Sequence, residues 1–382
     1  MQPFGCQRAL TTMMRIAVVV PGGVDQSGEY RVIPALLALI ERLSLHNEVH
    51  VFALNQEAKP REWHLAGARI HNVGQRYTRL QALRMIRALH RRSPFDLVHA
   101  IWSGACGQIA VTAGKMLGIP SLVHVAGGEL VALPEIGFGG RQSWRGRTRE
   151  ALVLRAATAI TAASGPMIEL LAALDLQAQR LPLGVDLRTW PARVPPRRNG
   201  SGVARLIHVA SLNRVKDQTT LLRALATLRT SGLNFHIDIV GEDTLQGAIQ
   251  ALCAQLGLSA RTRFHGFLTQ RQLRPVVESA DLMIVSSRHE AGPLALLEAA
   301  VAGVPTVGTA VGHVQEWAPQ AALAVPVGDS VELAGAIRRV LEDEELRLAI
   351  AHEAQRRATR EDADYTAARF QAVYSSICAR RS

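Results

Sequence analysis

The sequence has 382 residues, which is enough for two domains that each bury a core of their own. Hydrophobic residues make up 48% and charged residues 20%, a globular composition that excludes a largely disordered chain. Aromatic residues are only 4%, which argues against a stacking platform for single-stranded nucleic acid. The formal net charge is +11, and residues 1–191 hold 21 Lys and Arg against 13 Asp and Glu. Such an excess indicates an anionic partner, or simply an Arg-rich proteome.

We expect no signal peptide in the first residues of the sequence. Residues 1–13 lack the apolar core of a signal peptide, and no run of the sequence is apolar enough for a membrane span. We expect residues 1–13 to be a disordered extension. The cysteines are far apart and lack metal-ligand spacing, which is typical of reduced thiols in a cytoplasmic protein. They are Cys6, Cys106, Cys253 and Cys378.

Apolar strand-like runs alternate with helical segments along residues 14–190. The expected strands are Arg15–Val20, Glu48–Ala53, Ala68–His71, Leu97–His99, Ser121–Val125 and Ala159–Ala162. Continuous apolar strands separated by helices predict a parallel sheet that is covered on both faces. Residues 14–190 are therefore expected to form a Rossmann-like domain.

The alternation stops at residues 191–203, which are rich in Pro, Gly and charge and are expected to be a linker. It restarts in residues 204–360, which predict a second Rossmann-like domain. Residues 361–382 are expected to form a C-terminal helix that packs back on the first domain. The predicted fold class is α/β, with two doubly wound domains that face a cleft. Ligands of such sheets bind at the carboxyl ends of the strands.

The strongest chemical signal is SSRHEAGPLALLEAA at residues 286–300. A strand is expected to end near Ser286 and a helix to begin at Pro293–Leu294, since proline is favoured at the first helical position. Gly292 lets another group approach the backbone. The free N–H groups of Gly292, Leu294 and Ala295 would then form a diphosphate site that needs no metal.

Two glutamates, Glu290 and Glu298, flank this helix start with the spacing E-x7-E. Glu298 would lie near the cleft mouth, where its carboxylate can accept hydrogen bonds from ribose hydroxyls. Glu290 would reach a sugar or stabilise a cationic transition state. The alternative is that both are solvated carboxylates around an ordinary helix.

This segment, followed by AGVPTV at 302–307 and VGHVQE at 311–316, resembles the nucleotide-sugar signature of family 4 retaining glycosyltransferases, whose fold is called GT-B. The resemblance runs from about Met14 to the tail. It implies that Glu298 holds the ribose and that Glu290 is a catalytic residue beside the donor sugar. It also implies that the backbone between them holds the diphosphate, through Ala291, Gly292, Pro293, Leu294 and Ala295.

Other segments agree with the resemblance. VASLNRVKD at 209–217 follows the first strand of the second half, where the family has an Arg and a Lys that grip the donor phosphates. Lys216 falls on the Lys position and is assigned a catalytic and donor-binding role. Ser211 occupies the Arg position, and Arg214 stands nearby as a substitute. The remaining donor-side candidates are Gly22 and Gly23 after the first strand, Gly241 in a Gly turn, and Phe267 beside the nucleobase, which could equally be core.

The acceptor side is expected at Gly127, Gly128 and Glu129, which follow the strand Ser121–Val125. The family usually has a histidine before such a Gly-x-Asp/Glu segment, but here Ala126 stands there. His124 shares a strand face with Ala126 and is the substitute candidate for a catalytic role. The alternative is a plain buried histidine.

No metal or cofactor is expected besides the nucleotide sugar as co-substrate. The sequence has one Asp-x-Asp triplet, Asp362-Ala-Asp364, inside the charged C-terminal helix, where a solvated face is expected. The diphosphate would be neutralised by Lys216 and the helix end. Retention at the anomeric carbon is implied by the resemblance alone.

The expected partners are a nucleotide-sugar donor and a glycan or lipid-linked acceptor, with no nucleic acid. Basic segments around Trp144 and along residues 75–92 suit peripheral contact with an anionic membrane, in a cytoplasmic protein at the inner face of the plasma membrane. A helix packed on the sheet with a solvated Arg face is the alternative. Rival functions are a nucleotide-sugar 2-epimerase on the same fold and a decayed relic that only binds a nucleotide.

Overall fold

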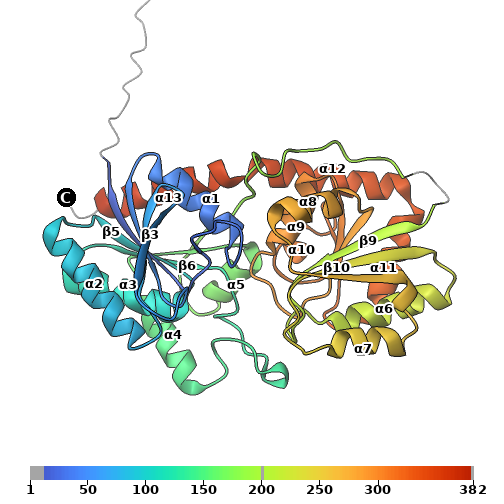
Figure 1. Ribbon diagram of the computed structural model, residues 1–382, viewed down its shortest axis with the longest axis horizontal. Coiled ribbons are helices and arrows are strands. Elements are labelled where there is room, and N and C mark those ends of the chain that lie inside the picture. Colours follow the sequence, from blue (N-terminus) through green and yellow to red (C-terminus); the bar gives the residue numbers. More distant parts are fainter. Residues whose placement is uncertain (1–12, 199–201, 380–382) are drawn as a thin grey trace, which may run out of the picture.

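The computed structural model describes residues 13–198 and 202–379 and contains two α/β domains (Figure 1). The extension expected at residues 1–13 lies outside the described residues except for Met13, as do residues 199–201 of the expected linker. No helix in the described ranges combines the length and the apolar character that crossing a membrane requires.

The first domain is built on an eight-stranded sheet in the order β3-β4-β2-β1-β5-β6-β7-β8. All neighbours are parallel except β3, which pairs antiparallel with β4 at the edge of the sheet. Its strands are β1 (Arg15–Val20), β2 (Glu48–Ala53), β3 (Arg61–Leu65), β4 (Ala68–Asn72), β5 (Leu97–Ile101), β6 (Ser121–Val125), β7 (Ala159–Ala162) and β8 (Gln179–Arg180).

Helices cover both faces of this sheet because its strands are apolar on both sides. One face packs against α1 (Pro34–Ser44), and a second core cluster fills the opposite face. The helices on that opposite face are α2 (Thr78–Arg92), α3 (Gln108–Leu117), α4 (Trp144–Ala156) and α5 (Gly165–Ala172). Short turns of π-helix (Ser103–Gly107) and 3-10 helix (Pro134–Ile136) follow β5 and β6.

The second domain has a six-stranded parallel sheet in the order β11-β10-β9-β12-β13-β14. Its strands are β9 (Ala204–Val209), β10 (Phe235–Val240), β11 (Thr262–Gly266), β12 (Leu282–Val285), β13 (Thr306–Thr309) and β14 (Leu323–Val325). Its helices are α6 (Gln218–Thr230), α7 (Ala248–Gln255), α8 (Gln270–Glu278), α9 (Leu294–Val301), α10 (Gly312–Trp317), α11 (Ser330–Glu342) and α12 (Glu344–Arg360), with a 3-10 turn at Ser259–Arg261.

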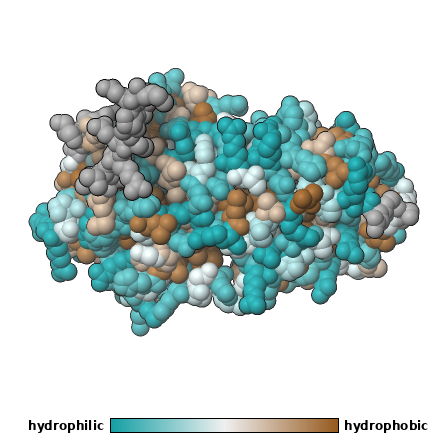
Figure 2. Space-filling model, turned by 90° about the horizontal axis from the view of Figure 1, so that it is seen from above, coloured by the Kyte–Doolittle hydropathy of each residue, from teal (hydrophilic) through white to brown (hydrophobic). Residues whose placement is uncertain are grey.

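The last helix, α13 (Ala363–Ala379), belongs to the first domain in space although it follows the second domain in sequence (Figure 1). Phe370 and Tyr374 of α13 are fully buried in the core beside α1. The Tyr374 hydroxyl lies 2.7 Å from Nδ1 of His99 on β5. Helix α13 therefore completes the core of the first domain. Figure 2 looks onto the surface that α12 and α13 cross, where polar residues predominate and apolar ones form small separate groups.

The aspartates of the Asp362-Ala-Asp364 triplet anchor this helix. The Asp362 carboxylate accepts a hydrogen bond from the backbone N–H of Tyr365 at 2.8 Å, and Asp364 forms an ion pair with Arg42 of α1. Asp364 is 74% exposed, as expected for a solvated face, but its carboxylate also forms an ion pair with Arg42, which was not expected.

The two domains meet through named contacts on both sides of the cleft. Arg180 at the end of β8 forms ion pairs with Glu316 of α10 and with Glu361. On the other side, the rings of Tyr30 and Phe267 lie 6.0 Å apart, one from each domain. The carboxyl ends of both sheets therefore face a space that is bounded by residues from both domains.

Candidate active site

The loop after β12 carries Glu290 to the cleft, where it meets Lys216 from the loop after β9. The Lys216 ammonium lies 2.5 Å from Oε1 of Glu290, and the Ser287 hydroxyl donates to the same oxygen at 2.6 Å. Both charged side chains are largely covered, with 25% of Lys216 and 11% of Glu290 exposed. A largely covered ion pair of this kind interacts more strongly than one on the surface, because water screens it less.

Hydrogen bonds to backbone groups fix these two loops to each other. The Ser286 hydroxyl donates to the Lys216 carbonyl at 2.8 Å, and the Arg288 N–H donates to the Val215 carbonyl at 2.7 Å. The Lys216 N–H donates to the Asn213 side chain at 3.1 Å. The position of the ammonium is therefore set by loop geometry as well as by its own rotamer.

Helix α9 begins directly behind this pair. Pro293 is its N-cap and Leu294 is its first residue, as expected from the sequence. The first backbone N–H groups of a helix lack partners within the helix and carry partial positive charge. Leu294 and Ala295 supply such groups here, so the start of α9 can bind an anion between the two glutamates.

The segment before α9 is pressed between the domains. Ala291 is buried in the core of the first domain. A Cβ on Gly292 would lie 2.9 Å from Nε2 of His313 and 3.3 Å from Cβ of Ala163 in the first domain. Close packing by neighbouring side chains therefore requires glycine at this position, whether or not a ligand also approaches.

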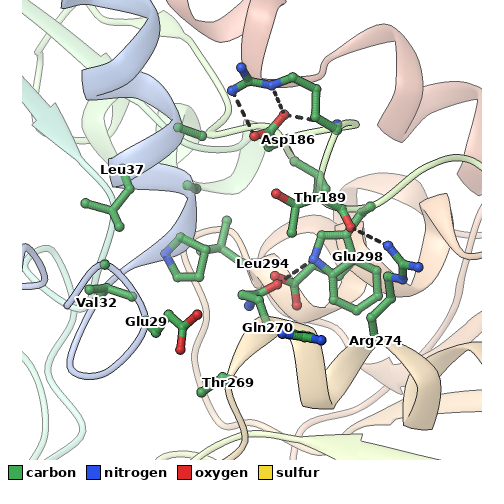
Figure 3. Close-up of a pocket in the computed structure, with 18 of the residues that line it drawn as sticks. Glu29, Val32, Leu37, Asp186, Thr189, Thr269, Gln270, Arg274, Leu294 and Glu298 are labelled. Carbon is green, nitrogen blue, oxygen red and sulfur yellow. Dashed lines mark hydrogen bonds and ion pairs between the residues drawn. The ribbon is translucent and has the colours of Figure 1, made fainter. Parts of the chain in front are cut away.

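Glu298 lies on the second turn of α9 and faces an interdomain cavity of about 840 Å³ (Figure 3). Figure 3 shows Val32 and Leu37 on the first-domain side, opposite Gln270, Arg274 and Glu298. The cavity is lined by the segment around α1, by residues 184–190 and by the start of α8. It combines an apolar wall with a few polar groups, as small-molecule sites do.

Burial raises the pKa of Glu298 to about 7, and a hydrogen bond with Gln270 offsets part of that rise. Gln270 in turn accepts a hydrogen bond from the indole N–H of Trp190, which is itself almost fully buried. The side chains of Trp190, Gln270 and Glu298 contact one another in that order, and so connect the end of the first domain to α8 and α9. They hold the carboxyl group at the cavity surface.

The other donor-side candidates of the second domain occupy the surrounding loops. Ser211 and Arg214 are exposed, and the Ser211 carbonyl accepts a hydrogen bond from Gln218 at 3.1 Å. Gly241 has a φ of +149°, and a Cβ there would lie 2.0 Å from the Ala210 carbonyl oxygen, so this turn requires glycine. Phe267 is 50% exposed and contacts Tyr30, so it lines the domain boundary and is not a core residue.

The Gly22-Gly23 turn follows β1, as expected. Gly23 has a φ of +82°, and a Cβ there would lie 2.6 Å from Ile33, so the turn and the packing explain this glycine. Gly22 lies against the Gln56 side chain. Among the described residues, no hydrogen bond or ion pair joins this turn to Lys216 or Glu290.

The acceptor-side loop does meet the Glu290 loop across the cleft. His289 Nε2 lies 3.2 Å from the Gly127 carbonyl oxygen, and Arg288 forms an ion pair with Glu135 at 3.0 Å. Glu129 turns toward its own domain, where Oε1 accepts a hydrogen bond from the Ser103 N–H at 3.1 Å. Burial, with a smaller contribution from Glu150, raises the pKa of Glu129 to about 7. A Cβ on Gly128 would lie 2.4 Å from the Phe138 ring.

The structure corrects the prediction for His124. Its side chain is fully buried on β6, where Nδ1 lies 2.9 Å from the Thr161 hydroxyl and the ring packs edge-on against Phe370. Burial lowers its pKa to about 3. His124 is therefore a core histidine beneath α13 and cannot reach a substrate. The misleading signal was the shared strand face with Ala126, since that face points to α13.

Three residues of the site were not singled out in the sequence. His289 stands directly before Glu290 in the strongest motif, so its position was a usable signal. Gln270 comes from the start of α8 and Trp190 from the end of the first domain, just before the linker, and no local pattern marks either residue. Among the described residues, no group of three or more His, Cys, Asp or Glu side chains could hold a metal ion.

Comparison with known families agrees with this geometry. Residues 197–357 match the family described as glycosyl transferases group 1, and residues 31–184 match the glycosyl transferase 4-like domain. Together the two matches span more than three quarters of the chain. The chain belongs to the group 1 glycosyltransferases.

The glycosyltransferase EpsF of Bacillus subtilis is 27% identical over 231 residues, which is 58% of this chain and 59% of EpsF. The chain thus spans less than two thirds of that relative.

Solved structures show that this glycosyltransferase has the GT-B fold. Sucrose-phosphate synthase from Thermosynechococcus elongatus superposes with a TM-score of 0.80 at 18% identity, covering 96% of this chain and all of that one. Anabaena HepE in complex with UDP-glucose superposes with a TM-score of 0.72 at 19% identity, covering 95% of this chain and all of HepE. At these identities the likeness concerns the fold alone.

Proposed function

We propose that the protein transfers a sugar, with retention and without a metal, from a nucleotide diphosphate sugar to a hydroxyl acceptor. The main support for this proposal is that three features follow one another around the start of α9. The Lys216–Glu290 pair lies before α9, unpaired backbone N–H groups form its first turn, and Glu298 faces the cavity one turn later. A nucleoside diphosphate sugar offers a sugar, a diphosphate and a ribose in that order.

In the proposed complex each group meets a complementary partner. The ribose hydroxyls donate to the Glu298 carboxylate, and the diphosphate accepts from the amides of Leu294 and Ala295 and from Lys216. Glu290 faces the sugar, where a carboxylate stabilises positive charge that develops at the anomeric carbon. HepE, which shares the fold, was crystallised with UDP-glucose, so UDP-sugars are the first donors to test.

Retention would follow from attack on the face from which the phosphate leaves. The acceptor oxygen forms its bond to the anomeric carbon as the bond from that carbon to the phosphate oxygen breaks. The hydroxyl proton passes to the departing phosphate. Lys216 and the start of α9 stabilise the negative charge that the phosphate gains, which is the role a divalent cation would otherwise play.

The acceptor side of the proposal rests on the loop that begins at Gly127 and on charge. We propose a glycan or lipid-linked acceptor, and peripheral contact of a cytoplasmic protein with an anionic membrane. The support is the excess of eight positive charges in residues 1–191.

A decayed relic that only binds a nucleotide is the second candidate. It is favoured by Ser211, which is exposed at the position where the family resemblance implies an arginine. Such a protein would bind a nucleotide but would neither hydrolyse nor transfer the sugar. Activity in addition to binding therefore separates the two functions.

The test combines thermal shift with slow donor hydrolysis, using a panel of nucleotide sugars in EDTA. A ligand that binds the native state raises the melting temperature by mass action. We expect one nucleotide sugar to stabilise the protein and to be hydrolysed slowly, and Glu298→Ala to abolish both effects. Glu29→Ala is the matched control, because Glu29 lines the same cavity from the first domain. Binding only with added Mg²⁺ would contradict metal independence, and binding without hydrolysis or transfer would favour the relic.

A further inference from the structure

The positive charge of the chain is concentrated in one segment of the first domain. Residues 76–158 contain twelve Lys and Arg and four Asp and Glu. Their net charge of +8 equals the whole excess of residues 1–191, so the rest of that half is neutral. The segment runs from the start of α2 to the end of α4.

These cations gather on one side of the domain, which we call the α2–α4 face. Helices α2, α3 and α4 cover the sheet on the side opposite α1 and α13 (Figure 1). Exposed cations point outward from all three helices, and no ion pair among the described residues neutralises them. They are Arg79, Arg84, Arg87, Arg91 and Arg92 on α2, Lys115 on α3, and Arg145, Arg147, Arg149 and Arg155 on α4.

The four acidic residues of the segment are engaged elsewhere. Glu150 is buried and accepts a hydrogen bond from the Ser103 hydroxyl, and Glu129 accepts one from the Ser103 N–H. Glu135 is paired with Arg288, and Asp96 accepts from the Arg15 N–H. Within the segment, the buried Glu150 carboxylate offsets part of this charge through its interactions with Arg149 and Arg141, and the net charge of the segment stays positive.

Large apolar side chains are exposed among these cations. Trp144 and Leu152 of α4 are each 65% exposed, and Leu80 of α2 and Met116 of α3 are 48% and 44% exposed. The Arg145 guanidinium lies 5.4 Å from the centre of the Trp144 ring, and that ring still remains exposed. A helix face that mixes Arg with exposed Trp and Leu is the pattern of an element lying in the headgroup region of a bilayer.

A shallow pocket on this face has the matching chemistry. It encloses about 370 Å³ and is lined by the arginines Arg141, Arg147 and Arg155 together with Leu152, Leu174 and Leu176. Guanidinium groups match the geometry of phosphate oxygens, and the leucines offer an apolar surface beside them. A phosphate headgroup with the first part of its acyl chain combines the same two features.

We propose that the α2–α4 face docks on an anionic membrane, with Trp144 and Leu152 inserted at the headgroup level and a lipid phosphate held between Arg141, Arg147 and Arg155. The charge supplies attraction from a distance, and the two apolar side chains supply contact once the surface is reached. A DNA duplex would contact the cations through its phosphates and would not require Trp144 or Leu152.

The docking surface is joined to the acceptor side of the cleft. The backbone N–H of Gly140, just before α4, donates to the Gly128 carbonyl at 2.9 Å. The backbone N–H of Arg141 donates to the Val131 carbonyl at 3.1 Å. Docking would therefore bring the loop that contacts His289 close to the lipid surface. The docking specifies the face and the residues of the membrane contact that is part of the proposed function. The direct access of a membrane-borne acceptor to the cleft rests in addition on the proposed transfer reaction.

The test is co-sedimentation of the full chain with sucrose-loaded vesicles. Neutral phosphatidylcholine vesicles are compared with vesicles containing phosphatidylglycerol, at low and high salt. We expect binding to the anionic vesicles only, weakened by salt. Replacing any one arginine of the α2–α4 face by a neutral residue should lower the partition coefficient onto anionic vesicles about five-fold. Arg147→Glu/Arg155→Glu should lower it at least about twenty-fold, since each change also adds a repulsive charge.

Controls keep docking separate from folding and from the donor site. Arg223→Glu/Arg263→Glu changes the net charge equally, at exposed positions of the second domain, and should bind vesicles nearly as the parent does. Trp144→Ala should lower binding without changing net charge. The melting temperature, with and without UDP, reports folding and the donor site independently of vesicles. The proposal is overturned if anionic vesicles do not sediment the protein, if both double variants behave alike, or if a DNA duplex competes fully while Trp144→Ala has no effect.

Discussion

The ammonium of Lys216 lies 2.5 Å from the carboxylate of Glu290, so in the absence of a donor these two residues neutralise each other. A donor diphosphate would compete with Glu290 for the ammonium. Binding would then free the carboxylate to face the sugar. The pair therefore keeps both charged groups in place before the substrate arrives.

Substitutions of Lys216 and of Glu290 should affect different properties, nucleotide binding for the lysine and turnover for the glutamate. We expect Lys216→Ala to weaken nucleotide binding about ten- to a hundred-fold, because it removes a charged hydrogen bond to phosphate. Glu290→Gln should leave nucleotide binding within a few-fold and lower kcat about a hundred- to a thousand-fold, because it removes stabilisation of the transition state. Calorimetry with UDP and steady-state kinetics measure the two effects. Equal losses of binding in both variants would show that Glu290 only positions Lys216.

Donor affinity should depend on pH through Glu298. Burial raises the pKa of this carboxyl to about 7 without a ligand, whereas ribose hydroxyls that donate to the carboxylate would lower it. The ligand then prefers the ionised form. Affinity is therefore constant above pH 7 and falls as the pH drops below it, about ten-fold between pH 8 and pH 6.

This dependence is best measured with a nucleotide sugar, whose diphosphate does not titrate in that range, and not with UDP. Glu298→Gln should bind more weakly at pH 8 and show a flat profile. A parent profile that is equally flat would mean that the carboxyl is already ionised in the free protein or does not contact the ribose.

Gly292 should tolerate no side chain. A Cβ there would lie 2.9 Å from Nε2 of His313 and 3.3 Å from Cβ of Ala163, across the domain boundary. Gly292→Ala should cost about 1–3 kcal/mol of stability by overpacking and should weaken donor binding as the start of α9 shifts. Gly335→Ala is the matched control, because Gly335 is exposed inside α11 with no atom within 4 Å of a new Cβ. It should stabilise by about 0.5–1 kcal/mol in urea unfolding.

Helix α13 should contribute strongly to the stability of the first domain. Phe370 is fully buried against β5 and β6, so Phe370→Ala should cost about 3–5 kcal/mol. Tyr374→Phe removes the hydroxyl that lies 2.7 Å from His99 and should cost about 1–3 kcal/mol. Fluorescence-monitored urea unfolding measures both. Values below 1 kcal/mol for both changes would mean that α13 is only loosely attached.

The regular parts of this fold could be predicted because each is determined locally. Buried parallel strands such as β1 and β2 are mainly apolar, and their bounds agree with those expected. Strand β3 was missed because Arg61-Glu-Trp-His-Leu65 buries only Trp63 and pairs at the sheet edge, where polar residues are tolerated. The C-terminal helix was expected from residue 361, and α13 begins at Ala363. The break between α11 and α12 at Asp343 depends on a capping side chain that a charge pattern does not reveal.

The site could be predicted only as far as its contacts follow chain order. Glu290, the start of α9 and Glu298 share one segment, so their relative placement follows from a strand that leads into a helix. His124 was misplaced because strand alternation gives the face of a residue but not what covers that face. Here α13 covers it from more than 240 residues away. The contact of Gln270 with Trp190 also depends on tertiary structure, as does that of His289 with Gly127.

The position of α13 has a consequence for synthesis. The first domain buries Phe370 and Tyr374, which leave the ribosome only after the whole second domain has been made. Until then the apolar face of β5 and β6 that carries His99 and His124 lacks the helix that covers it. The first domain therefore completes its core only after α13 has been made. A gene cut at the linker would separate the first domain from its own final helix. A fragment that ends at residue 190 should therefore recover its native core only when a peptide spanning residues 363–379 is supplied.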